Sequence, residues 1–156
     1  LCGAVGTIAL TLGGLEGGYI VRSVEFSQEA GQAPRLSVEG IAYDGGETLS
    51  SRTYAISESG LTVADMNSLT VTGGGEETSI TRRWEMELVT QPGGDGQIAY
   101  VAPRTPMEMY EESGSGTMAA PALAGYTLES FENSDSNQEL DTYSVSFKKG
   151  LTTVVA

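Results

Sequence analysis

The chain has 156 residues, of which 21 are acidic and 8 are basic, and its formal net charge is −13 at pH 7. A chain of this length fits one ordinary domain, and so acidic a surface repels nucleic-acid backbones and anionic lipid. We therefore expect a single β domain over residues 1–156 that neither binds nucleic acid directly nor associates with a membrane.

Histidine and cysteine usage restricts the chemistry further. The chain contains no histidine, so the commonest general base and the commonest zinc ligand are both missing. The single cysteine, Cys2, cannot form an internal disulfide, and without a histidine a nucleophilic role is not expected for it. The composition thus predicts no catalytic residue, no cofactor and no metal ligand.

The predicted elements are short strands, because apolar and polar residues alternate and glycine clusters separate the runs. In chain order, strands are expected at residues 5–12, 35–42, 48–56, 68–72, 80–88, 97–101 and 142–148. The alternation is clearest in 80–88, where Trp84 and Met86 share the apolar face and Arg82 is an exception. At most one short helix is expected, at residues 62–68. The fold class is all-β, as an antiparallel sandwich or a barrel.

A segment that occurs twice without a gap adds an architectural constraint. Residues 18–38 and 125–145 lie 107 positions apart and are identical at seven of twenty-one positions: Gly18/Gly125, Tyr19/Tyr126, Ser23/Ser130, Glu25/Glu132, Ser27/Ser134, Ser37/Ser144 and Val38/Val145. A polar stretch with turn-forming residues interrupts each copy. Each copy is therefore predicted to be an antiparallel hairpin, with Tyr19 and Tyr126 in equivalent places.

Residues 103–121 read PRTPMEMYEESGSGTMAAP and differ in character from the rest of the chain. They combine three prolines and a Gly/Ser run with little periodicity. Such a segment is typical of an extended arm or a long loop. We expect this arm to reach outside the folded body.

Paired carboxylates are the remaining candidates for acid–base chemistry. The pairs are Glu76 with Glu77, Glu85 with Glu87, and Glu111 with Glu112. The first pair is expected in a loop after three glycines, the second on the solvated face of a strand, and the third in the arm. None of them is predicted to be held rigidly enough for catalysis.

Three further patterns have both a functional and a structural interpretation. Oxygen-bearing side chains recur at every second position, as in a calcium-binding loop: Asn133, Asp135, Asn137, Glu139 and Asp141. The EF-hand positions do not align, so an ordinary polar turn is expected. The glycines at 73–75 lack the Lys-Ser/Thr of a phosphate-binding loop. Tyr19 and Tyr126 follow a glycine at a strand start, which favours sheet anchoring over stacking on a sugar.

The two units YIVRSVEFSQEAGQAPRLSVEG and YTLESFENSDSNQELDTYSVSFKKG resemble strand-turn-strand segments of β-rich virion structural proteins of tailed bacteriophages, of the tail-tube, head-tail or decoration type. The resemblance implies a noncatalytic subunit that self-associates through β-edges and an extended arm. Its partners would be copies of itself and other structural subunits. It would reside in a virion or an extracellular assembly and assemble in the host cytoplasm.

Two alternatives belong to other functional classes. A ligand-binding β-sandwich, such as a carbohydrate-binding or adhesin domain, would be a monomer with a cluster of exposed aromatic side chains. An enzyme would require an assembled constellation with a base. Self-association separates the first interpretation from these two.

Overall fold

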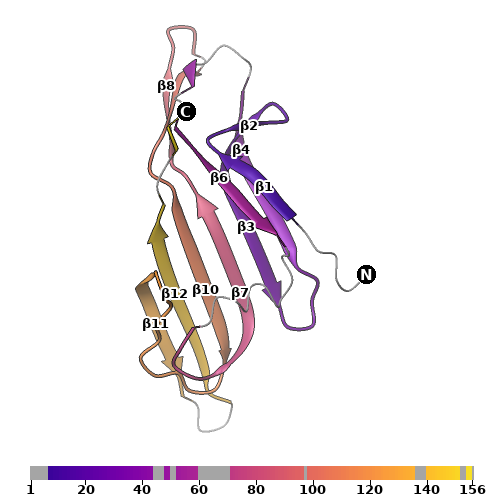
Figure 1. The fold of residues 1–156 in the computed structure, drawn as a ribbon, viewed down its shortest axis with the longest axis vertical. Helices are drawn as coiled ribbons and strands as arrows, with labels where there is room; N and C mark the ends of the chain where they lie inside the picture. Colours follow the sequence, from indigo (N-terminus) through magenta and orange to yellow (C-terminus); the bar gives the residue numbers. More distant parts are fainter. Residues whose placement is uncertain are drawn as a thin grey trace.

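The structure is a computed structural model that describes residues 7–43, 48–49, 52–59, 71–96, 98–135, 140–151 and 154–155. Every regular element in these residues is a β-strand, which confirms the predicted all-β class. The helix expected at residues 62–68 lies outside the described residues. The strands form a sandwich-like arrangement of open sheets and not a closed barrel (Figure 1).

The largest sheet contains seven strands. Six of them are hydrogen-bonded one to the next in the order β11 (Thr127–Ser134), β12 (Thr142–Gly150), β10 (Met107–Ser115), β7 (Glu76–Glu85), β3 (Tyr19–Glu29) and β2 (Leu15–Glu16). The seventh, β4 (Arg35–Ala42), also pairs with β3. Each neighbouring pair in this sheet is antiparallel. The hairpin β3–β4 therefore lies at one side of the sheet and the hairpin β11–β12 at the other, with β7 and β10 between them (Figure 1).

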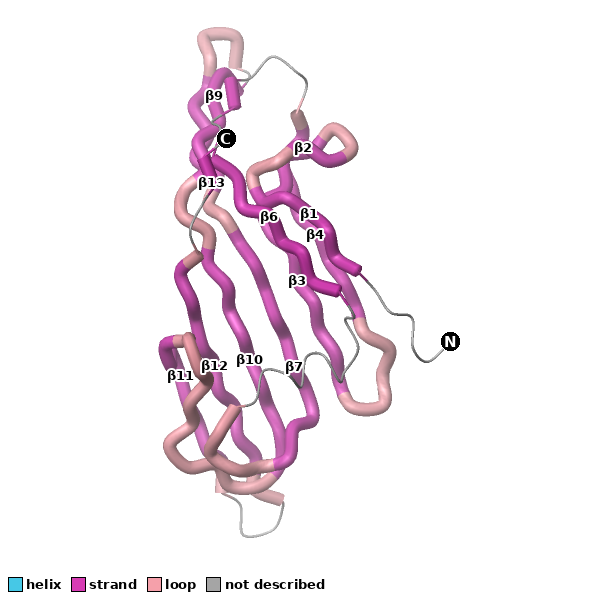
Figure 2. Tube along the Cα trace, in the orientation of Figure 1, coloured by secondary structure: helices cyan, strands magenta, loops and turns pink. Residues whose placement is uncertain are grey.

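Two smaller sheets complete the fold. One has the order β1 (Thr7–Leu12), β6 (Arg52–Ser59), β13 (Val154–Val155), and the other has the order β5 (Thr48–Leu49), β9 (Ile98–Pro103), β8 (Leu88–Pro92). Strands β1 and β6 lie over the side of the large sheet that contains β3 (Figure 2). This second layer covers one face of β3 and leaves the outer strand β4 largely uncovered.

The core forms on the face of the large sheet that the second layer covers. Its buried residues come from both layers and from the β10–β11 connection: Leu12, Val21, Val24, Phe26, Ile56, Ile80, Trp84, Met86, Tyr110, Met118, Leu123, Tyr143, Val145, Phe147 and Leu151. Full burial of one large apolar side chain contributes about 1.5–3 kcal/mol. The period of two predicts this face correctly, because successive side chains of a strand point to opposite sides.

Most of the predicted strands are present. β1, β4, β9 and β12 confirm four of them, with ends shifted by a few residues. The stretch 48–56 is divided between β5 and β6, and 80–88 spans the end of β7 and the start of β8. Of the predicted strand 68–72, only the last two residues are described, and Thr72 forms an isolated bridge with Ala122.

The prediction of an extended arm at 103–121 is wrong. Strand β10 occupies the middle of this segment and lies between β7 and β12 in the large sheet. The side chains of Glu108, Tyr110 and Glu112 are buried, as is Gly114. The alternation was hidden because two core-facing positions carry carboxylates and a third carries glycine, none of which is typical of a buried strand face.

The two copies of the repeat form hairpins with the same pairing register. Every β11–β12 pair is a β3–β4 pair moved by 107 residues, for example Val24 with Val38 and Phe131 with Val145. Both hairpins contain an irregularity at the same place, before Ser23 in β3 and before Ser130 in β11. Their preceding glycines, Gly18 and Gly125, share a φ of +84°, which favours glycine. The predicted pair of related hairpins is confirmed.

Substitution of Gly114 tests the placement of β10. A Cβ there would collide with the carbonyl oxygen of Glu76 and lie 2.7 Å from the Tyr143 ring, so neither neighbour has room to retreat. Gly114→Ala should lower the free energy of unfolding by about 1–3 kcal/mol, measured by urea denaturation. The control Gly150→Ala, where nothing lies within 4 Å, should leave it almost unchanged. Equal effects of the two substitutions would contradict the packing described for β10.

Candidate functional site

The open edges of the large sheet are the most distinctive surface feature. Within the described residues, β4 pairs only with β3, and β11 pairs only with β12. Nearly every residue of both strands is exposed. A strand with one free edge presents a row of unpaired backbone N–H and C=O groups, which natural proteins usually protect. We call the free side of β4 the β4 edge and that of β11 the β11 edge.

The internal repeat shows what each edge strand looks like when it has a neighbour on both sides. Val38 in β4 and Val145 in β12 are counterparts, which means that they lie 107 residues apart. Val145 is 1% exposed, because β12 has β10 as a second neighbour on the side opposite β11, whereas Val38 is 47% exposed. On the second edge, Leu128 in β11 is 44% exposed and its counterpart Val21 in β3 is 2% exposed. Burial at these positions therefore depends on the presence of a neighbouring layer or strand.

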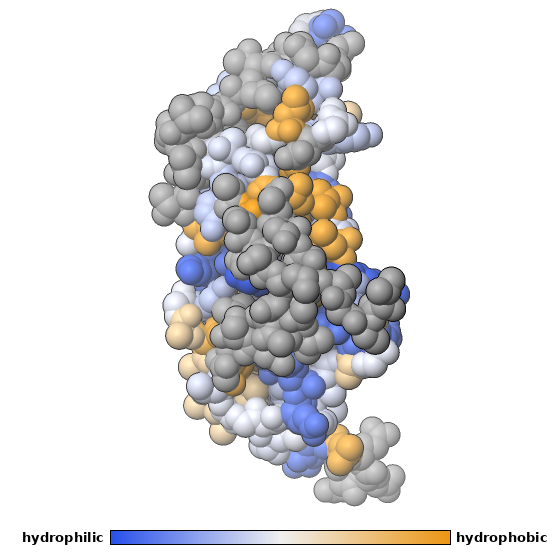
Figure 3. Space-filling view, turned by 45° about the vertical axis from the view of Figure 1, so that its right-hand side comes forward, coloured by the Kyte–Doolittle hydropathy of each residue, from blue (hydrophilic) through white to orange (hydrophobic). Residues whose placement is uncertain are grey.

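A shallow groove of about 570 Å³ lies on the β3–β4 hairpin and is lined by Tyr19, Val21, Arg22, Val38, Glu39 and Gly40. Beside it, Leu36 is also half-exposed. Gly40 has no room for a side chain, because a Cβ would lie 2.6 Å from the Ile20 carbonyl oxygen. Figure 3 turns the right-hand side of Figure 1 forward and shows apolar atoms gathered in the upper half of that view. Exposed apolar patches of this type mark contact surfaces.

The two repeat tyrosines occupy equivalent places but make different contacts. Tyr126 is half-buried, and its hydroxyl donates a hydrogen bond of 2.5 Å to Glu108 on β10. The Lys149 ammonium lies 5.5 Å from the centre of the same ring. Tyr19 is 55% exposed, and its hydroxyl makes no hydrogen bond with the described residues. The predicted anchoring role is thus confirmed for Tyr126 and wrong for Tyr19.

A buried polar network crosses the centre of the large sheet. Glu112 accepts hydrogen bonds from the hydroxyls of Tyr143 at 2.6 Å and Tyr110 at 3.0 Å. Burial, first, and then the charge of Glu112 raise the pKa of Tyr110. In Tyr143, burial and the hydrogen bond to Glu112 raise the pKa. Both hydroxyls therefore remain protonated, and their hydrogen bonds hold the Glu112 carboxylate in its buried position.

Glu108 explains the irregular position of Arg82 in the alternation of β7. The Arg82 Nε lies 2.5 Å from a Glu108 carboxylate oxygen, and both side chains are largely buried. The Arg82 guanidinium also lies 4.6 Å from the centre of the Trp84 ring. Burial and the hydrogen bond to Glu108 raise the pKa of Tyr126, so its hydroxyl also remains a donor. Sequence reasoning missed Glu108, although Arg82 at an apolar position was the signal that a buried acid had to oppose it.

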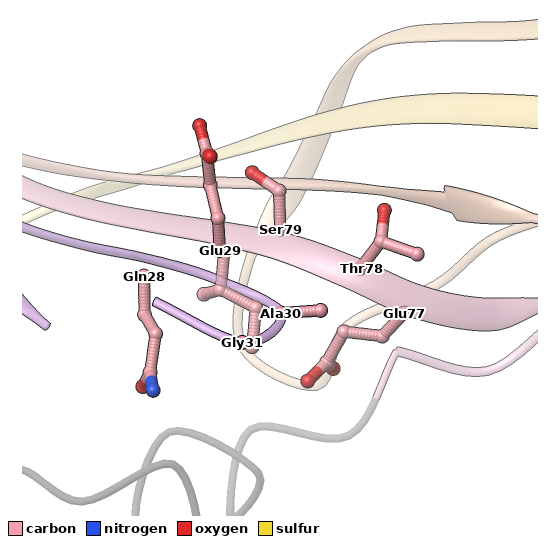
Figure 4. Close-up of a pocket in the computed structure, with 8 residues that line it drawn as sticks. Gln28, Glu29, Ala30, Gly31, Glu77, Thr78 and Ser79 are labelled. Carbon is pink, nitrogen blue, oxygen red and sulfur yellow. The ribbon is translucent and has the colours of Figure 1, made fainter. Parts of the chain in front are cut away.

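Glu76 and Glu77 are the first residues of β7 and not part of a loop. Burial, and then the charge of Glu112, raise the pKa of Glu77. Glu77 and Gln28 point to the same side of the sheet and line a pocket of about 200 Å³, whereas Glu29 and Ser79 point to the other side (Figure 4). Glu76 is exposed. The two carboxylates are thus separated by the strand and do not form an acid–base pair.

The other predicted carboxylate pairs are also separated. Glu85 forms an ion pair with Arg83 at 3.3 Å, and Glu87 lies 4.0 Å from Arg104 after the end of β7. In β10, Glu111 is exposed while Glu112 is buried, so alternation places them on opposite faces. No predicted pair is therefore brought together in the way that two-carboxylate catalysis requires.

The polar segment considered for calcium is partly described. The Asn133 side chain forms two hydrogen bonds with the backbone of Met118. Its Nδ2 donates to the Met118 carbonyl oxygen at 2.7 Å, and its Oδ1 accepts from the Met118 N–H. Asp141 accepts a hydrogen bond from Thr117, and residues 136–139 lie outside the described part. Among the described residues, no three acidic, histidine or cysteine side chains are grouped closely enough to hold a metal ion. The described members of the segment thus fix the β10–β11 connection.

The remaining predictions concern short segments. The glycines at 73–75 all have positive φ and lead directly into β7. Cys2 lies outside the described residues. In the part of the chain that the structure describes, no helix is long and apolar enough to cross a membrane.

Comparison of the chain with protein-family models, with curated proteins and with solved structures found no match. Its function is therefore inferred from the geometry of the sheet and its edges.

Removal of the Tyr143 hydroxyl tests the buried network. Tyr143→Phe leaves the Glu112 carboxylate with one donor fewer in a buried position. The free energy of unfolding should fall by about 1–3 kcal/mol, measured by chemical denaturation at pH 7. The hydroxyl of the exposed Tyr100 makes no hydrogen bond with the described residues, so Tyr100→Phe should have almost no effect. A neutral Tyr143→Phe would mean that the hydroxyl does not support Glu112.

The raised pKa of Glu77 predicts a pH-dependent stability change. The folded protein binds this proton more tightly than the unfolded chain does, so stability is lost as the pH rises through the folded pKa. Glu77→Gln should therefore raise the free energy of unfolding at pH 7, and the gain should vanish below the ordinary value of 4.5. Denaturation series at several pH values measure this difference. Glu76→Gln is the matched exposed control, and an equal gain in both variants would contradict the assignment.

Proposed function

We propose that this protein is a noncatalytic structural subunit that self-associates through the open edges of its large sheet. The contrast between Val38 and Val145 carries the proposal. The same residue at the same place in the repeat is buried where its strand has a neighbour on both sides and half-exposed where its strand has a neighbour on one side only. Pairing with a strand of another molecule would satisfy the free backbone groups and cover the exposed apolar side chains.

The kind of assembly that we propose is a virus-like or filamentous one, and specifically a tail or virion component of a bacteriophage. Two features support this proposal: an all-β body built around two related hairpins, and edges at opposite sides of one sheet. The high negative charge, −13, is compatible with repeated contact between copies only where contacts are specific. Partners would be further copies of the chain and other structural subunits.

A ligand-binding role is the second candidate, and the groove on the β3–β4 hairpin favours it. Tyr19 is exposed there beside Arg22 and Glu39, and an aromatic ring next to polar side chains is suited to a sugar. This alternative requires a monomer whose Tyr19 fluorescence or NMR signals change on titration with oligosaccharides.

Blocking the β4 edge tests the leading proposal. A lysine in place of Val38 would put a charge among the apolar side chains of the edge, which disfavours strand addition. Val38→Lys should remain folded, because Val38 is half-exposed, yet sediment as single chains at concentrations where the natural sequence forms multimers. Leu140→Lys, at a highly exposed position in the β11–β12 connection, should assemble normally. A natural sequence that stays monomeric at high concentration overturns the proposal.

A further inference from the structure

We propose that the strand that covers the β4 edge is β11 of a second copy, so that the large sheet continues from one molecule into the next. This inference rests on the self-association proposed above and names the partner of each edge. Three independent features of the large sheet support it: the directions of its outer strands, the faces on which their apolar groups lie, and the charges that they carry.

The strand directions permit head-to-tail addition without turning the second copy over. From one side to the other the strands are β4, β3, β7, β10, β12 and β11, and each neighbouring pair is antiparallel. Because the number of alternating strands is even, β4 and β11 run in opposite directions. The β11 edge of one molecule can therefore pair antiparallel with the β4 edge of the next, and the alternation continues unbroken.

The apolar side chains of both edges lie on the same face of the sheet. The pairing register puts Leu36 and Val38 in β4 on the core face, together with Leu128 and Phe131 in β11. When β11 of one copy adjoins β4 of the next in the same orientation, these side chains become cross-strand neighbours. Apolar cross-strand pairs of this type stabilise antiparallel sheets.

The opposite face supplies charge complementarity, and the molecule contains its own example of the contact. Glu25 in β3 is the direct cross-strand partner of Arg83 in β7, and their charged groups lie 3.9 Å apart. Glu132 in β11 is the counterpart of Glu25, and among the described residues it has no ion-pair partner. Arg35 in β4 is likewise unpaired within the described part and lies on the same face. Head-to-tail pairing brings these two charges together.

Symmetric pairing satisfies the edges less completely. Two β11 edges brought together would place the acidic side chains of one strand, Glu129 and Glu132, beside those of its copy, and like charges opposite each other are destabilising. A symmetric β4–β4 dimer would therefore leave both β11 edges free. Head-to-tail pairing uses both edges of every copy, and it generates a ring or a filament according to the rotation between copies.

Cysteine cross-linking distinguishes these arrangements. In a Cys2→Ser background, we would prepare Ser37→Cys in β4 and Ser130→Cys in β11, both at exposed positions on the same face. A bismaleimide with a spacer of about 8 Å spans direct and diagonal cross-strand neighbours. A mixture of the two variants should give covalent dimers, either variant alone should give none, and a chain that carries both cysteines should give a ladder of oligomers.

A charge exchange provides a second readout that does not depend on cross-linking. Arg35→Glu should weaken association by about fivefold to tenfold, and Arg35→Glu combined with Glu132→Arg in one chain should restore it. Arg104→Glu changes the net charge equally at an exposed position away from both edges and should leave association unchanged. Circular dichroism would confirm that each variant is folded.

The outcomes separate this inference from the proposed function. If the natural sequence forms no multimers, self-association itself fails, and with it both proposals. If multimers form but the mixed cysteines do not cross-link, or if Ser37→Cys cross-links alone, self-association stands and the β4–β11 contact is wrong. If the charge exchange fails to restore association while the mixture cross-links, the edges meet without the Arg35–Glu132 contact, and that part of the inference is overturned.

Discussion

The central strand β10 is the constraint on which the rest of the architecture depends. It carries Glu108 and Glu112 into the covered face of the large sheet, where burial of an unpaired carboxylate would cost several kcal/mol. Donors on three neighbouring elements meet this requirement: Arg82 on β7, Tyr143 on β12 and Tyr126 before β11. The observed order of strands satisfies both carboxylates. The network thereby fixes β10 between β7 and β12 and places one hairpin at each side of the sheet.

This placement exposes opposite strands of the two hairpins, the second strand of β3–β4 and the first strand of β11–β12, although the two hairpins share their register. In the β11–β12 hairpin the second strand is the inner one and pairs with β10, whereas in the β3–β4 hairpin the second strand is the outer one. The same local structure therefore has opposite surroundings. The half-exposed Val38 and the hydrogen-bonded Tyr126 are consequences of position in the sheet and not of differences in local conformation.

The sequence predicted the local structure better than the arrangement of the strands. Alternation identified β7 and β12, and the repeat predicted two equivalent hairpins, because both signals depend on backbone geometry and on near neighbours. The strand β10 was missed because its core-facing positions carry Glu108 and Glu112, whose partners lie far away in the sequence. Nor could the sequence reveal which strand of each hairpin would be outermost, since strand order depends on long-range packing. The candidate site consists of the two edges, so it could not be predicted from the sequence either.

The composition of β4 is consistent with a strand that is kept available for pairing. Natural edge strands commonly carry an inward-facing charge, a central proline or a run of lysines that prevents strand addition. Strand β4 has none of these on its core face, where Leu36, Val38 and Gly40 alternate with Arg35, Ser37 and Glu39. Strand addition at the β4 edge is opposed instead by the net charge of the whole chain, −13. This charge repels copies that approach in unproductive orientations. General repulsion combined with one unprotected edge favours a single specific contact over indiscriminate aggregation, because only a contact that buries apolar area and pairs Arg35 with an acid outweighs the charge.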